Sequence, residues 1–215
     1  KMLSTKYNTY KHRTHSDEAV RCTDYHLPQE VADVVDFVAP TVNFPGKFHI
    51  NADRAASDSE TVQNTPESLR SLYNVGDVMG GASDTHQACT AFLHQYYLES
   101  DLQSFYDEYF SPLSGVPMAD VVGPNDGNAG VEASLDAEYM SVMGAGVPTE
   151  FWSFAGRHPD APENEPFLDW LYLVGNSTSP PMVFSTSYGE DETSVTLDYA
   201  ERMNEEFQKG ALRGI

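Results

Sequence analysis

Residues 130–140 read G-V-E-A-S-L-D-A-E-Y-M, a stretch that predicts the start of a helix with Glu132 and Asp136 four positions apart. Side chains at this spacing share one face of a helix. Two ionised carboxylates there repel each other by roughly 0.2–0.5 kcal/mol, so stability alone would favour a lysine after the glutamate. The acid pair therefore indicates either a function that needs two neighbouring carboxyl groups or an ordinary acidic helix surface.

Short apolar strands are predicted on both sides of this helix, at residues 118–122 and 149–154. Farther out, the same alternation of strands and helices continues in both directions. The remaining predicted strands are 88–97 and 182–187, and the remaining predicted helices are a segment opening at Thr65, 102–110, 166–174 and 193–212. Strands that alternate with helices favour an α/β fold with a parallel sheet.

The N-terminal part of the chain has a different pattern. Strands are predicted at residues 7–10 and 19–25, and a short helix opens at 27–30, with valines at helical spacing up to Val38. Residues 47–63 are polar with little periodicity, the composition of an exposed linker that proteases cut easily. Regular secondary structure is predicted again from Thr65 and Pro66, which suit the N-cap and first position of a helix.

The net charge of −21 is unevenly distributed. Residues 1–62 carry nine Asp and Glu against seven Lys and Arg, whereas residues 63–215 carry twenty-four against five. No basic face is available for phosphates, so nucleic-acid binding is not expected. No apolar run approaches the roughly 18 residues of a membrane span. A near-neutral segment that packs on an acidic domain would explain this difference in net charge, and so would an acidic surface exposed to solvent.

Several single residues have possible chemical roles. Cys22 and Cys89 form neither a disulfide framework nor a zinc signature, so buried thiols and no metal site are expected. Asn176 begins an N-S-T sequon before S-P-P, which suits a glycosylated surface loop. His86 and His158 show no carboxylate or serine partner at readable spacing, and both are interpreted as structural or surface residues. The tryptophans, Trp152 and Trp170, are expected in packing.

Four stretches in order resemble the sedolisin family of serine-carboxyl peptidases. They are T-P-E-S-L-R-S-L-Y-N-V (65–75), the 130–140 stretch, G-R-H-P-D-A-P-E-N-E-P-F-L-D-W-L (156–171) and S-T-S-Y-G-E-D-E (185–192). Within the family, the lysosomal tripeptidyl peptidase branch is the most similar. The resemblance runs along the whole chain and is strongest from Leu69 onward. Residues 27–38, L-P-Q-E-V-A-D-V-V-D-F-V, resemble the end of the family's propeptide.

The resemblance implies a subtilisin-like parallel sheet with flanking helices, incomplete here and preceded by the C-terminal part of an α+β prodomain. Residues 1–46 would belong to the propeptide domain, 47–63 to a processed linker, and 64–215 to the N-terminal part of the catalytic domain. The implied location is lysosomal or secreted, in an acidic compartment. The implied partners are peptides, unfolded proteins and the chain's own propeptide, with no membrane and no nucleic acid.

The resemblance also implies roles for residues of a Ser-Glu-Asp triad. Glu132 would be the general base, and Asp136 would orient it and share a proton with it. Ser187, Tyr188 and Gly189 would line the substrate cleft, where backbone groups can pair with an extended peptide. Carboxyl groups have ordinary pKa values near 4, so a carboxylate base works at acid pH, where the expected activity is release of tripeptides from peptide N-termini.

Some of the family's machinery is not found in these 215 residues. Neither the S-G-D-x-G motif of the oxyanion aspartate nor the G-T-S motif of the nucleophilic serine is present. The family's Ca²⁺ site would likewise come from a C-terminal segment outside this sequence. We therefore expect an internal fragment of a precursor that is inactive alone. A truncated non-catalytic pseudo-peptidase, an inhibitory or binding fragment, and an acidic α/β binding module with an incidental acid pair are the alternatives.

Overall fold

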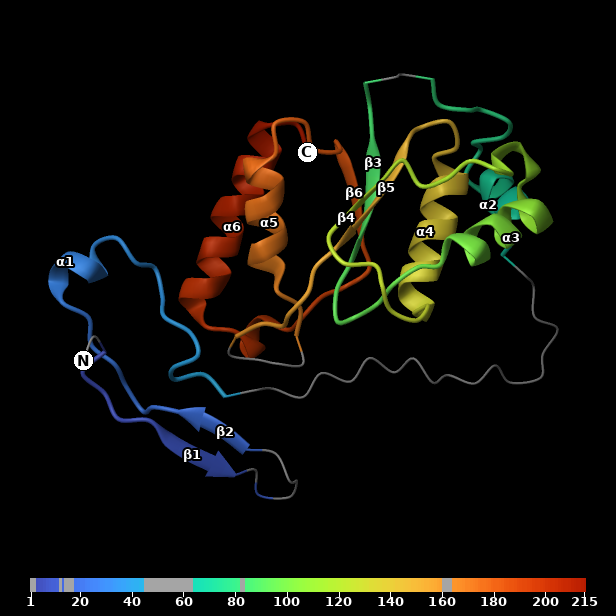
Figure 1. Ribbon diagram of the computed structural model, residues 1–215. Helices are drawn as coiled ribbons and strands as arrows, with labels where there is room; N and C mark the ends of the chain where they lie inside the picture. Colours follow the sequence, from blue (N-terminus) through green and yellow to red (C-terminus); the bar gives the residue numbers. More distant parts are fainter. Residues whose placement is uncertain (1–2, 12, 14–17, 45–63, 82–83, 160–163) are drawn as a thin grey trace. The chain divides into compact units, whose positions relative to one another are not determined.

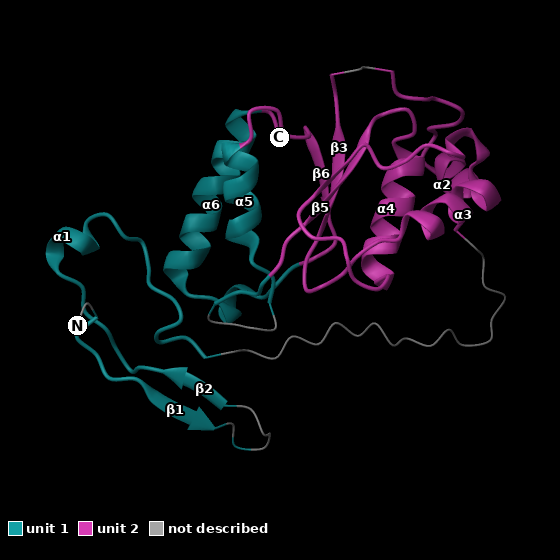
Figure 2. Ribbon diagram, in the orientation of Figure 1, with its two compact units in different colours: residues 1–48, 156–176, 189–213 teal, residues 49–155, 177–188, 214–215 magenta. Residues whose placement is uncertain are grey.

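The computed structural model describes residues 3–11, 13, 18–44, 64–81, 84–159 and 164–215 (Figure 1). The chain divides into two compact units (Figure 2). Unit 1 consists of residues 1–48, 156–176 and 189–213, and unit 2 consists of residues 49–155, 177–188 and 214–215. The predicted linker at 47–63 lies outside the described residues.

Unit 2 contains a four-stranded parallel sheet with the order β4-β5-β3-β6. The strands are β3 (Gln87–Ala91), β4 (Asp120–Val122), β5 (Thr149–Ser153) and β6 (Val183–Thr186). Every residue of the two central strands, β3 and β5, is buried, as expected for strands in the middle of a parallel sheet. The predicted α/β class with a parallel sheet is confirmed.

Three helices of unit 2 form a layer against this sheet: α2 (Pro66–Leu72), α3 (Glu99–Tyr109) and α4 (Val131–Met143). Helix α4 packs on β3 and β5, and both α2 and α3 pack on α4. A short 3-10 helix, η1 (Ser111–Leu113), follows α3. The core between the layers consists of small and aromatic residues that include Cys89, Ala91, Tyr97, Leu102, Tyr106, Ala133, Ala137, Val142 and Phe151. The small residues let α4 lie close to the sheet.

Strand β3 is shorter than the prediction of 88–97. It ends at Ala91 because Leu93 and His94 adopt positive φ angles of 54° and 63°, which turn the chain out of the sheet. The apolar residues beyond the turn still join the core, since the Tyr97 ring packs on Phe151 with centroids 4.8 Å apart. Hydrophobicity alone could not separate the buried strand from the partly exposed turn that follows it.

In its described residues, unit 1 contains an antiparallel hairpin and three α-helices. The hairpin pairs β1 (Asn8–Lys11) with β2 (Glu18–Arg21), and the helices are α1 (Gln29–Ala32), α5 (Phe167–Asn176) and α6 (Leu197–Leu212). Helices α5 and α6 pack against each other. The short helix predicted to open at 27–30 does not continue along the valines up to Val38, because α1 ends at Ala32 and Val34 is 81% exposed. In the described residues no helix is long and apolar enough to cross a membrane.

Helix α6 begins four residues later than predicted. Thr196 is its N-cap, and the hydroxyl accepts a hydrogen bond from the Tyr199 amide at 3.3 Å. The residues just before it form a 3-10 turn, η2 (Glu192–Ser194). The sequence pattern predicted most of this turn as part of the helix. Both cysteines, Cys22 and Cys89, are buried free thiols, as predicted.

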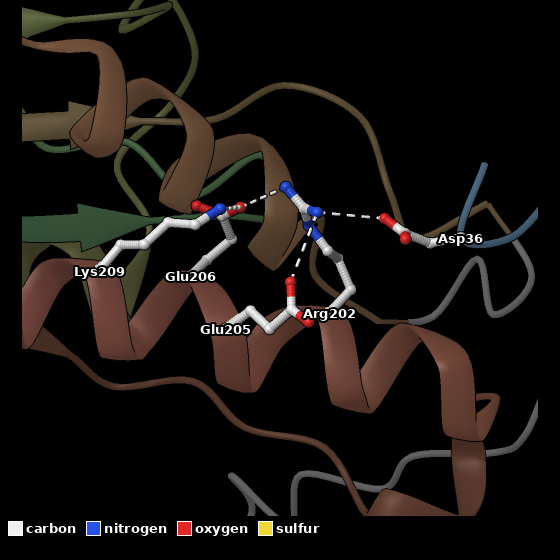
Figure 3. A network of polar contacts seen from close by, with 5 residues as sticks. All are labelled: Asp36, Arg202, Glu205, Glu206 and Lys209. Atoms are coloured by element: carbon white, nitrogen blue, oxygen red, sulfur yellow. Dashed lines mark hydrogen bonds and ion pairs between the residues drawn. The ribbon is translucent and has the colours of Figure 1, made fainter. Parts of the chain in front are cut away.

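Residues 36–43 contact the start of α6 within unit 1. Asp36 pairs with Arg202 at 3.1 Å (Figure 3), and the Phe37 ring packs edge-on against Tyr199 with centroids 5.6 Å apart. The Asn43 side chain also donates to the Ser194 carbonyl at 3.0 Å. Three contacts of different chemistry thus join this N-terminal segment to residues more than 150 positions away in sequence.

Candidate active site

Helix α4 carries both acids of residues 130–140, Glu132 and Asp136. Gly130 is its N-cap, so Glu132 lies in the first turn, where the positive end of the helix dipole favours a carboxylate. Asp136 follows one turn later on the same face. Asp136 is 9% exposed, whereas Glu132 is only partly buried. The helix therefore presents one carboxyl group at an accessible position and, one turn later, a second one that is shielded from water.

The Asp136 carboxyl group is held from the end of β6. Its Oδ1 accepts a hydrogen bond of 2.6 Å from the Ser187 hydroxyl. Its Oδ2 is also buried but makes no hydrogen bond to any residue that the structure describes. Glu132 and Asp136 are not hydrogen-bonded to each other in the described part of the chain. The site thus contains one satisfied and one unsatisfied oxygen on the same buried carboxyl group.

Burial raises the pKa of Asp136 to about 6, the hydrogen bond from Ser187 lowers it in part, and the charge of Glu132 raises it again. Cys89 on β3 lies near the same group. Burial, followed by the charge of Asp136, raises the pKa of its thiol to about 12, so Cys89 remains neutral. Below pH 6 the Asp136 carboxyl group therefore carries a proton that it can donate, which is the property expected of a partner for a carboxylate base.

The other residues of the predicted substrate cleft have distinct surroundings. The Tyr188 ring packs edge-on against Phe92, with centroids 5.1 Å apart, and its hydroxyl reaches the Phe92 carbonyl at 3.5 Å. Gly189 is exposed, and a Cβ added to it would meet no atom within 4 Å. The backbone of Ser187, Tyr188 and Gly189 as a peptide-binding edge stays a prediction, as do the catalytic roles of Glu132 and Asp136.

His86 has a carboxylate partner that spacing along the sequence did not reveal. Its Nδ1 lies 2.5 Å from Glu150 Oε1, and the other oxygen of Glu150 accepts a hydrogen bond from Trp152 Nε1 at 2.7 Å. The two residues are 64 positions apart and meet because β3 and β5 are neighbours in the sheet. Trp152 is buried as predicted, so this cluster belongs to the packing of the sheet.

His158 and Trp170, in unit 1, are structural, as predicted. The buried His158 ring packs edge-on against Tyr199 at 4.3 Å, and burial lowers the pKa of the imidazole to about 4. Trp170 is buried and packs on Phe207. Asn176 is exposed at the end of α5, so its side chain is accessible for the glycosylation that the sequon predicts.

Sequence patterns did not point to Arg70 on α2, although the structure makes it central to the position of α4. The side chain is 3% exposed and donates hydrogen bonds to backbone carbonyls at the C-terminal end of α4. Within the described ranges, no cluster of three or more His, Cys, Asp or Glu could hold a metal ion. The site in this chain is thus a pair of carboxyl groups on a rigidly held helix.

A parallel α/β unit whose central helix carries this acid pair is the arrangement that the sedolisin resemblance implies. Residues 1–44 match the family described as "Pro-kumamolisin, activation domain". This match and the sequence similarity to tripeptidyl-peptidases together show that the chain belongs to the sedolisin family of peptidases.

The similar proteins are tripeptidyl-peptidases. The chain is 40% identical over 198 residues to Tripeptidyl-peptidase 1 of Mus musculus, 39% over 201 residues to that of Homo sapiens, and 38% over 199 residues to that of Bos taurus. Each match covers 89% of this chain and 35% of the relative. The chain therefore spans about a third of the length of these relatives.

The raised pKa of Asp136 predicts a pH-dependent stability difference. A carboxyl group that binds its proton more tightly in the folded state stabilises the fold fully below pH 3.8, and this contribution is lost as the pH rises through about 6. Asp136→Asn removes the dependence, so the variant should gain about 2–3 kcal/mol over the wild type between pH 4 and pH 7. Urea unfolding of both chains at several pH values measures this difference.

The stability of the wild type is compared with that of Asp136→Asn because other acids titrate in the same pH range. The pKa values of Glu138 and Glu190 are also raised, to about 6 and about 7, chiefly by burial. These contributions are common to the wild type and Asp136→Asn, so they cancel. Parallel stability curves for the two chains would contradict the burial of an ionisable group at this position.

Proposed function

We propose that this chain forms part of a serine-carboxyl peptidase that acts at acid pH and releases tripeptides from peptide N-termini. The observation that carries the proposal is the buried, readily protonated Asp136 one helical turn from the accessible Glu132, in a chain similar to tripeptidyl-peptidase 1. In this assignment residues 1–46 are the C-terminal part of a propeptide domain, 47–63 a processed linker, and 64–215 the N-terminal part of the catalytic domain.

In the proposed reaction Glu132 is the general base. It takes the proton of a serine hydroxyl while the serine oxygen bonds to the scissile carbonyl carbon, and it later gives that proton to the leaving amine. Protonated Asp136 donates to the Glu132 carboxylate and fixes its orientation. A histidine base would be charged at acid pH and could not accept the proton, so a carboxylate suits this range.

The nucleophilic serine and the oxyanion aspartate would come from the family motifs that these 215 residues do not contain. We therefore propose that residues 1–215 alone do not cleave peptides. Peptides and unfolded proteins would be the substrates, with the backbone of residues 187–189 pairing with the substrate. An acidic compartment, lysosomal or secreted, a Ca²⁺ ion bound elsewhere and a glycan on Asn176 belong to the same proposal.

The test begins by sequencing the transcript beyond Ile215. Both missing motifs should follow, and the full-length product should release tripeptides from an unblocked peptide at pH 4–5 but not from the same peptide with a blocked N-terminus. Cleavage of the blocked peptide would indicate an endopeptidase instead. If translation stops without a G-T-S motif, the product is a non-catalytic pseudo-peptidase or a binding fragment, and the proposed enzyme is wrong.

Arg202 is expected to hold the proposed propeptide in place. It links α6 to Asp36, and it also lies 2.5 Å from Glu206 in the network of Figure 3. An ion pair between partly exposed groups contributes about 0.2–1 kcal/mol, so Arg202→Met should speed acid conversion of the full-length precursor by about 1.4- to 5-fold. Timed gel analysis at pH 5 with N-terminal sequencing of the product measures the rate.

Lys209→Met is the matched control. Lys209 pairs with Glu206 at 2.7 Å in the same network but makes no hydrogen bond or ion pair with the described residues of the N-terminal segment. Its loss should leave the conversion rate near that of the wild type. Equal acceleration by both variants would show that the helix was destabilised generally, and would overturn the role of the Asp36 contact.

A further inference from the structure

The Ser187 hydroxyl contacts one acid of the proposed catalytic pair, although Ser187 itself is exposed at the strand end. Its hydroxyl, 51 positions away from Asp136 in sequence, donates to Asp136 Oδ1 at 2.6 Å. Ser187 follows directly after β6, a strand held in the sheet by its pairing with β3. The donor is therefore fixed by the sheet, while its acceptor is fixed by α4, which packs on the same sheet.

This hydrogen bond favours one of the two oxygens of Asp136 as the site of its proton. A hydroxyl that donates to Oδ1 uses that oxygen as an acceptor, so a proton on the carboxyl group resides on Oδ2. Oδ2 is buried and makes no hydrogen bond in the described residues. Burial of an O–H group without an acceptor costs free energy. The proton on Oδ2 is therefore expected to be donated to a nearby acceptor.

Glu132 is the acceptor best suited to this proton. It lies one turn earlier on the same helix face and interacts electrostatically with Asp136. Cys89 faces Asp136 from β3, but its thiol is neutral and a weak acceptor. From β6 the facing group is the uncharged hydroxyl of Ser187. The proton of Asp136 is thus directed to the carboxylate that the proposed reaction uses as a base.

We propose that Ser187 is a positioning residue of the peptidase, whose hydroxyl holds Asp136 Oδ1 so that Oδ2 presents the shared proton to Glu132. The assignment rests on the proposed function and gives the Ser187 side chain a role separate from the substrate-binding backbone of residues 187–189. A purely structural link between β6 and α4 would affect stability and the titration of Asp136, but it would change neither kcat nor the pH profile of catalysis.

The first experiment follows the Asp136 carboxyl carbon by ¹³C NMR in the 215-residue chain, with Asp136→Asn identifying its signal. Ser187→Ala should raise the titration midpoint by about one pH unit, because the hydrogen bond that favours the ionised form is lost. Ser187→Thr keeps the hydroxyl and should keep the wild-type midpoint. Ser185→Ala, on the same strand, is the matched control and should also leave the midpoint unchanged.

The second experiment uses the full-length product. Ser187→Ala should lower kcat by about 10- to 100-fold, with KM changed less than twofold and the pH profile displaced toward higher pH. Ser187→Thr should restore kcat. A raised KM with unchanged kcat would overturn the proposal and leave Ser187 as a substrate-binding residue only.

The two experiments separate failure of this inference from failure of the proposed function. An Asp136 midpoint that is the same in the wild type and Ser187→Ala overturns the positioning role, whatever the activity of the enzyme. A shifted midpoint together with full activity of a Glu132→Gln enzyme shows that Ser187 controls Asp136 but that the pair is not the catalytic base, which overturns the proposed function and with it the catalytic part of the inference.

Discussion

Glu132→Gln should lower kcat of the full-length peptidase by about 10²- to 10⁴-fold, the contribution of a positioned general base. The amide is nearly the same size as the carboxyl group but cannot accept the proton of the serine hydroxyl. KM should change little, because Glu132 acts on the nucleophile rather than on the substrate. Steady-state kinetics with an unblocked peptide at pH 4–5 measures both constants.

Glu138→Gln provides the control for this experiment. Glu138 lies on the same helix, is partly buried, and burial raises its pKa to about 6, so it shares most properties of a catalytic acid except its place in the pair. Its replacement should leave kcat within about twofold of the wild type. Full activity of Glu132→Gln would leave the acid pair as an ordinary feature of an acidic helix and would favour the binding-module alternative.

The elements that the sequence predicts best are those with a local cause. Thr65 and Pro66 mark the start of α2 by capping and by fixed backbone geometry, and the structure confirms both, with the Thr65 hydroxyl accepting from the Ser68 amide. Spacing along α4 likewise places Glu132 and Asp136 on one face. Such features depend on a few neighbouring residues, so a single sequence is enough to recognise them.

Features that depend on sheet order could not be predicted from spacing. The contact of His86 with Glu150 requires β3 beside β5, and the contact of Ser187 with Asp136 requires β6 to end near α4. Neither strand order nor the path of the chain after β6 can be calculated from local propensity. The acid pair was therefore visible in the sequence, whereas the contact of Ser187 with Asp136 was not.

Arg70→Met should lower the free energy of unfolding by about 3 kcal/mol, the loss expected for a buried cation with several hydrogen bonds. The guanidinium group donates to four carbonyls: Gly76 at 3.0 Å, Val142 at 2.7 Å, Met143 at 3.2 Å, and Val78. Two of these acceptors are at the C-terminal end of α4, where a positive charge also stabilises the helix dipole. Urea unfolding of the 215-residue chain gives the difference.

The geometry of the guanidinium group, and not only its charge, should matter. Arg70→Lys keeps the charge but offers a single donor centre, so it should recover only part of the lost stability. Arg13→Met removes an exposed arginine and should change stability by less than about 0.5 kcal/mol. Equal stability of the wild type and Arg70→Met would mean that other donors satisfy these carbonyls. A loss confined to Arg70 would instead show that the helix carrying Glu132 and Asp136 is held in place by a side chain from α2, more than 60 residues earlier in the chain.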